Sequence, residues 1–245
     1  MRPIDNPGRV AGLWYLLLVI LGPLRLIYIP GKLFVPGIAA ATVNNIAAHE
    51  SLFRLGIAAN LVGAVVLIFL TLAFYRLFAE VDRNLAVQVV IFGGVMPSLL
   101  YFVGVGYDLG VLIFVRGADF LSVFDKPQRD ALAVLFLKLY DYQNTAAETL
   151  WGVWLLPLAV LVYRSRFLPR FLGVWLALCG FAYLALSFSG VLWPQYQGEI
   201  FKISQPAFFG EMALMLWLVI KGAKPYNVGA AASLSAPPSG GIAEL

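Results

Sequence analysis

Four polar residues, Lys138, Asp141, Thr145 and Glu148, recur at spacings of three or four residues within a largely apolar stretch. In a helix, residues with this spacing share one face. A charged side chain at membrane depth is unfavourable by several kcal/mol unless it meets a partner or water. If this stretch crosses a membrane, we expect its polar face to line a cavity that opens toward the outer side and can hold a polar head group.

Three more polar residues stand in other apolar stretches, at depths that we expect to match this face: Arg25, Asn60 and Glu211. Arg25 would anchor an anionic group, and the acids would set the polarity of the pocket. We assign no catalytic residue and predict a binding site for a small amphiphilic or lipid-like ligand. The predicted ligand-binding residues are Arg25, Asn60, Asp141, Glu148 and Glu211.

Other interpretations of the same residues stay open. In the simplest, Arg25 pairs with Glu148 or Glu211, and the charges only fix the register of the helices. In another, a buried Glu performs acid–base chemistry on a hydrophobic substrate as part of a membrane-embedded enzyme. A third interpretation is a transporter for a small solute, although neither internal repeats nor interrupted helices are evident.

Residues that bind metals and cofactors are scarce. The chain has one cysteine, Cys179, and one histidine, His49, so it cannot assemble a zinc, haem or iron–sulfur site alone. The carboxylates have no spacing typical of a Ca²⁺ or Mg²⁺ loop. We therefore predict no cofactor and no metal site.

The composition identifies the class of protein. Of the 245 residues 61% are hydrophobic and 12% are charged, whereas soluble domains carry about 25% charged residues. This excludes a water-soluble globule and a disordered chain. The 17 Lys and Arg residues are scattered at the ends of apolar stretches, as expected for membrane spans. We expect the lipid bilayer as a partner, no nucleic acid, and an oligomer as a possibility.

A spanning helix needs about 20 apolar residues, and six stretches qualify. We therefore predict an all-α polytopic bundle of six transmembrane helices in residues 1–224. The tail 225–245, rich in Ala, Ser, Gly and Pro, is predicted to be disordered. The expected spans are 10–30, 52–78, 85–106 with an apolar continuation to 115, 144–163, 169–193 and 207–220.

Six spans place both termini on one side of the membrane. That side carries nine basic residues near the span ends against six on the other, which favours cytoplasmic termini. The apolar residues in 130–142 recur at helical spacing. We therefore expect a helix that starts outside the bilayer and continues unbroken into the fourth span.

Several phrases carry a family resemblance. They are Arg9-Val-Ala-Gly-Leu-Trp-Tyr-Leu, Thr42-Val-Asn-Asn-Ile, Leu52-Phe-Arg-Leu-Gly, the segment 163–173 and the closing segment 210–222. The most specific is Ser165-x-Phe-Leu-Pro-Arg-x-Leu-Gly. In this order they resemble the DUF4386 family of bacterial membrane proteins, which has no established biochemical role. The resemblance implies a compact six-helix protein of the bacterial inner membrane and supplies no catalytic residue.

Overall fold

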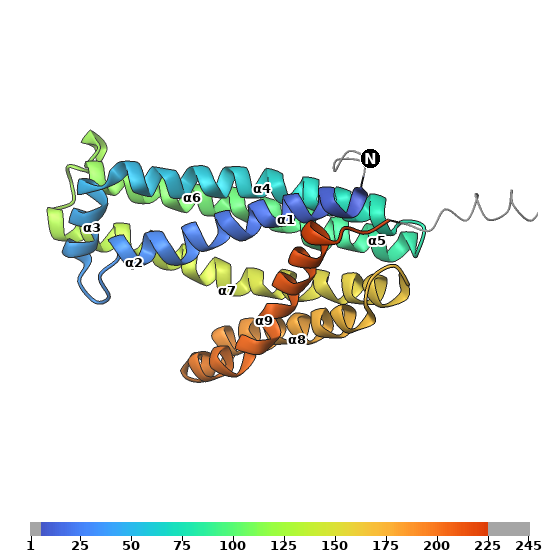
Figure 1. Cartoon of the computed structure of the whole chain (residues 1–245). Coiled ribbons are helices and arrows are strands. Elements are labelled where there is room, and N and C mark those ends of the chain that lie inside the picture. The colour runs from blue at the N-terminus through green and yellow to red at the C-terminus, as the bar shows by residue number, and fades with distance from the viewer. Residues whose placement is uncertain (1–5, 225–245) are drawn as a thin grey trace, which may run out of the picture.

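The computed structural model describes residues 6–224, so the predicted disordered tail 225–245 lies outside the described residues. Helices form nearly all of the described chain, and no strand occurs in this part (Figure 1). The α-helices are α1 (Pro7–Pro23), α2 (Ile29–Leu33), α3 (Ala39–Ala48), α4 (Glu50–Phe78), α5 (Arg83–Val89), α6 (Met96–Arg116), α7 (Lys126–Arg164), α8 (Arg170–Leu192) and α9 (Gln197–Ile220).

Within residues 6–224, six helical stretches are long and apolar enough to cross a membrane, which confirms the predicted all-α polytopic bundle. The protein is therefore an integral membrane protein. The spans are generally longer than the sequence predicted. They cover Pro7–Leu33, Glu50–Phe78, Arg83–Arg116, Lys126–Arg164, Arg170–Leu192 and Pro194–Ile220.

Both ends of the described chain meet at one end of the bundle. Gly8 N–H donates to the carbonyl of Ala223 at 3.0 Å, and Oδ1 of Asn6 accepts from Ala223 N–H at 3.1 Å. We call this the inner end, and we call the opposite end, which carries α3, the outer end (Figure 1). The shared side is thus confirmed, whereas its cytoplasmic location stays a prediction.

Two spans are interrupted by π-helical segments, Leu24–Tyr28 and Val90–Val95. In each, the residue before a proline bonds five residues back: Ile29 N–H to the carbonyl of Leu24, and Met96 N–H to that of Ile91. Proline lacks the N–H that would continue the α-helical pattern, so the wider turn accommodates the break. The first of these segments contains Arg25, whose side chain is buried inside the bundle.

Helix α7 is one continuous helix of 39 residues, which confirms the predicted unbroken helix. It begins with a capping box in which Asp125 accepts from Gln128 N–H at 2.8 Å and Gln128 Oε1 accepts from Asp125 N–H at 3.0 Å. At about 1.5 Å per residue it is roughly 58 Å long, twice the ~30 Å hydrocarbon core. Its outer part therefore projects beyond the bilayer.

Helix α8 packs along the inner part of α7. Ser187 donates to the carbonyl of Thr145 at 2.6 Å, which brings the outer end of α8 level with that residue. The helices also touch at Gly152 and Gly180, where an added Cβ on Gly152 would lie 2.6 Å from the carbonyl oxygen of Gly180. Residues 126–141 of α7 therefore lie outside the region that α8 covers.

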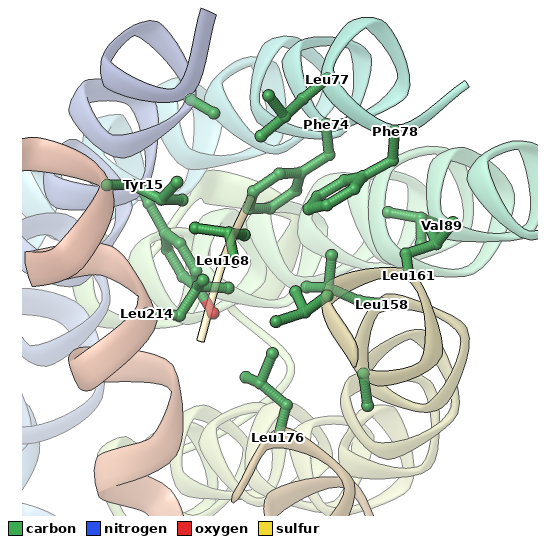
Figure 2. Packing of buried hydrophobic residues seen from close by; sticks show 14 of the residues in the cluster. Tyr15, Phe74, Leu77, Phe78, Val89, Leu158, Leu161, Leu168, Leu176 and Leu214 are labelled. Carbon is green, nitrogen blue, oxygen red and sulfur yellow. The ribbon is translucent and has the colours of Figure 1, made fainter. Parts of the chain in front are cut away.

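The apolar core has an inner and an outer part. The inner cluster joins α1, α4, α5, α7, α8 and α9, and Figure 2 shows Tyr15, Phe74, Leu158 and Leu214 converging within it. The outer cluster joins α2, α3, α4, α6 and α7. The predicted polar residues lie at and between these two cores.

Candidate functional site

Arg25 and Asp108 form a buried ion pair between the first span and α6. Nη2 of Arg25 lies 2.6 Å from Oδ1 of Asp108, and Nε donates to Oδ2 at 3.2 Å. Their side chains are 4% and 1% exposed. Gly56 of α4 leaves room for the arginine, since an added Cβ there would lie 3.0 Å from its Cδ.

The expected pairing of Arg25 with Glu148 or Glu211 is therefore wrong. The predicted third span ended at residue 106, two residues before Asp108. In the structure α6 continues to Arg116, which carries Asp108 inside the bundle. The apolar continuation of the sequence to Val115 was the signal that could have located this partner.

Tyr140 of α7 completes the cluster around Arg25. The guanidinium carbon lies 3.9 Å from the centre of the Tyr140 ring, a cation–π contact. Nδ2 of Asn60 donates to the hydroxyl of Tyr140 at 3.0 Å. The structure thus brings together two of the predicted residues, Arg25 and Asn60, through a tyrosine that the sequence analysis missed.

This cluster leaves little room for a ligand. Arg25 and Asn60 line a crevice of about 10 Å³, near the minimum for one water molecule. The positive charge of Arg25 is already paired with Asp108. Ligand binding by Arg25 and Asn60 stays a prediction. The contacts that the structure shows join four helical elements: the first span, α4, α6 and α7.

Asp141 lies elsewhere, at the edge of a larger pocket at the outer end, and we call this the outer pocket. Its volume is about 470 Å³, and it lies between the connection from α2 to α3 and the outer part of α7. Oδ2 of Asp141 is 3.7 Å from Nζ of Lys138, and both side chains are more than half exposed. The pocket is lined by Phe34, Val35, Pro36, Gly37, Ile38, Ala39, Thr42, Val134, Leu137, Lys138 and Asp141.

Hydrogen bonds hold the wall of the outer pocket in place. Val35 N–H donates to Oγ1 of Thr42 at 2.8 Å, and the same hydroxyl donates to the carbonyl of Val35 at 3.2 Å. Nδ2 of Asn45 donates to the carbonyl of Leu33 at 3.2 Å. Helix α3, which the sequence analysis did not predict, thus fixes the connection that forms the wall.

Glu211 lies in the inner core, apart from both the Arg25 cluster and the outer pocket. Its Oε2 accepts a hydrogen bond from the hydroxyl of Tyr15 at 2.7 Å, and its Oε1 lies 3.7 Å from the sulfur of Cys179. These donors come from α1 and α8, so Glu211 joins three helices. Nothing in the apolar sequence around Tyr15 or Cys179 signals this role.

Glu148 lies on α7 beside the seam with α8. Oγ1 of Thr149 and Oγ of Ser187 are 2.8 Å apart across this seam. Oε2 of Glu148 is buried and has no hydrogen-bond partner among residues 6–224. The polar face predicted on α7 is therefore divided. Lys138 and Asp141 line the outer pocket, whereas the hydroxyl of Thr145 donates to the carbonyl of Asp141 within α7 and only its backbone carbonyl accepts from Ser187 of α8.

The family model described as "Domain of unknown function (DUF4386)" matches residues 10–222, nearly the whole chain. The chain belongs to the DUF4386 family. This confirms the resemblance drawn from the sequence phrases.

One relative of this DUF4386 protein is an uncharacterized protein from Archaeoglobus fulgidus. It is 34% identical over 73 residues, which is 30% of this chain and 42% of the relative. The match therefore spans less than half of that relative's length. No solved structure gives a significant match to the DUF4386 chain.

Proposed function

We propose that the protein binds a small amphiphile in the outer pocket, with the apolar part of the ligand inside and its polar end at Lys138 and Asp141. The observation that carries this proposal is the pocket itself. Its volume of about 470 Å³ falls within the 300–1,000 Å³ that is typical of small-molecule sites. Ligand pockets of this kind are mostly apolar with a few placed polar groups.

The chemistry of the lining supports an amphiphile rather than a polar solute. Phe34, Val35, Ile38, Val134 and Leu137 supply apolar walls. At one edge stand an ammonium and a carboxylate, 3.7 Å apart and accessible. A ligand with a hydrocarbon part and a charged or zwitterionic head would match both surfaces.

The position of the pocket supports the same class of ligand. It lies along residues 134–141 of α7, just outside the level at which α8 ends near Thr145. From Arg164 to Thr145, α7 rises by roughly 28 Å at ~1.5 Å per residue, close to the ~30 Å of the hydrocarbon core, so we place the outer boundary of the bilayer at this level. A lipid-like molecule can enter there without leaving the membrane.

Native mass spectrometry of the mildly solubilised protein tests the proposal. Val134→Trp fills the pocket, whereas Leu135→Trp places the same bulk on the 49% exposed neighbouring position. We expect a co-purified molecule, or saturable binding of added lysophosphatidylcholine, on wild type and Leu135→Trp and its loss from folded Val134→Trp. Binding that persists in Val134→Trp, or no binding of either kind to wild type, contradicts the proposal.

Acid–base catalysis has one specific observation in its favour, the buried and unpartnered Oε2 of Glu148. A catalytic acid or base needs a free oxygen close to its substrate. If the enzyme alternative holds, folded Glu148→Gln accumulates a bound species that differs in mass from that of wild type. Identical bound species in both proteins exclude it. The transport alternative stays a prediction, which solute flux in proteoliposomes tests.

We also propose that the protein resides in the bacterial inner membrane with cytoplasmic termini. The excess of basic residues at the inner end supports this orientation. A green fluorescent protein fused after Lys224 should fluoresce, and alkaline phosphatase fused at the same site should be inactive. The reverse pattern contradicts the orientation.

A further inference from the structure

A long apolar groove runs between α7 and α8 at the inner half of the bundle. Its volume is about 580 Å³, and Leu156, Val160, Val174 and Phe181 are among the residues that line it. The middle of the groove is lined by small residues, Ala159, Gly173 and Ala177. An added Cβ on Gly173 would lie 2.7 Å from the carbonyl oxygen of Ala159, so backbone forms part of the floor.

The inner end of this groove is basic. Arg164 lines the groove next to Tyr163, and the guanidinium carbon of Arg170 lies 5.6 Å from the centre of the Tyr163 ring. Arg166 stands between them in the sequence, and all three arginine side chains belong to exposed residues. Three positive charges therefore gather within seven residues of chain.

Ion pairs leave most of this positive charge unbalanced. Within residues 6–224, Arg164 meets a carboxylate only at Asp82, with Nη1 3.4 Å from Oδ2, and its side chain remains 60% exposed. Arg166 and Arg170 make no ion pair with the described carboxylates. Helix α8 also starts at Arg170 without a side-chain cap, which adds the positive end of its dipole.

The length of the groove matches one leaflet of a bilayer. From Arg170 to Phe181 the helix rises by roughly 16 Å at ~1.5 Å per residue. Half of the ~30 Å hydrocarbon core is about 15 Å. An acyl chain lying in the groove would therefore reach the bilayer centre near Phe181, while its head group stayed at the arginines.

We propose that this groove binds a phospholipid whose head group has a net negative charge, from the leaflet at the inner end. The acyl chains occupy the apolar groove, and the phosphate lies against Arg164 and Arg170. Arginine suits phosphate because its planar guanidinium donates two parallel hydrogen bonds. Basic pockets between transmembrane helices select anionic lipids by the same charge complementarity. This site is at the opposite end from the outer pocket and does not depend on it.

Native mass spectrometry with phosphatidylglycerol and phosphatidylcholine of identical acyl chains tests the proposal. We expect wild type to retain phosphatidylglycerol preferentially. Each of Arg164→Gln and Arg170→Gln should weaken that preference about fivefold, and the double variant about 25-fold. Arg76→Gln, an exposed arginine at the same end but not part of the groove lining, should keep the preference.

A second pair of variants separates a lipid from a free phosphate ion. Ala177→Phe fills the groove and should remove both lipids, whereas Leu178→Phe, at a 57% exposed position on the same helix, should retain them. Inorganic phosphate should not displace phosphatidylglycerol. Equal retention of the two lipids by wild type, an unchanged preference in folded Arg170→Gln, or displacement by phosphate overturns the proposal. Val134→Trp should leave the preference intact, which separates this test from that of the outer pocket.

Discussion

Removing one partner of the buried Arg25–Asp108 pair should destabilise the bundle strongly. Asp108→Leu leaves a guanidinium enclosed by protein, with only the face of Tyr140 as a favourable contact. Breaking a buried pair in this way is unfavourable by about 3–5 kcal/mol. The equilibrium constant for unfolding should therefore rise by between about a hundredfold and a few thousandfold.

Replacing both partners should recover most of the loss. Arg25→Met with Asp108→Leu removes both charges and keeps apolar volume, and such replacements are often neutral or stabilising. We expect the double variant to be at least about 2 kcal/mol more stable than Asp108→Leu alone, which is a large coupling between contacting residues. The assay is detergent-induced unfolding in mixed micelles, followed by tryptophan fluorescence.

The exposed pair of Lys138 and Asp141 provides the matched control. Its side chains are 62% and 57% exposed and 3.7 Å apart, so the same double-variant cycle should give a coupling of at most about 1 kcal/mol. If the losses from Arg25→Met and Asp108→Leu simply add, the two side chains do not hold each other in the folded protein. That result would refute the reasoning from the buried ion pair.

Further predictions concern packing and single hydrogen bonds. Gly12→Ala should lower the free energy of unfolding by about 1–3 kcal/mol, because the new Cβ would lie 2.7 Å from the backbone nitrogen of α9 at Val219. Gly22→Ala on the same helix meets nothing within 4 Å and should be neutral or slightly stabilising. Tyr140→Phe removes only the hydroxyl bond to α4 and should be destabilising by about 0.5–1.5 kcal/mol. Tyr15→Phe takes a donor from a carboxylate oxygen and should be destabilising by about 1–3 kcal/mol. Thermal unfolding in detergent measures all four, and equal stability of the two glycine variants would contradict the close approach of α1 and α9.

The fold was largely predictable because a helix that crosses a bilayer needs about 20 consecutive, mostly apolar residues. The six spans and the unbroken α7 follow from composition and from the spacing of apolar residues in 130–142. The span ends were less predictable. Hydropathy does not show how far a helix continues beyond an apolar stretch, so the predicted third span ended at residue 106, although α6 continues to Arg116 and buries Asp108.

The site was predictable in residue type but not in partners. Arg25, Asn60 and Glu211 were selected because polar groups at membrane depth need partners, and each of them has partners in the structure. Those partners include Tyr15 and Tyr140, and a tyrosine in an apolar run is ordinary in a membrane protein. Helix α3 also escaped prediction, because a short helix without a spanning length leaves only a weak pattern. Because α3 was not expected, the wall of the outer pocket, which α3 holds in place, was not predicted either.

The contact between α1 and the segment that ends α9 has a consequence for biogenesis. Helix α1 is the first span to be synthesised, yet the face that carries Gly8 and Gly12 packs against the end of α9 and the residues after it. A chain that enters the membrane from its N-terminus must keep this face uncovered until the last span has been inserted. Insertion of α9 therefore closes the ring of helices. A protein truncated before α9 would present an unfinished surface on α1 to the quality-control proteases of the membrane.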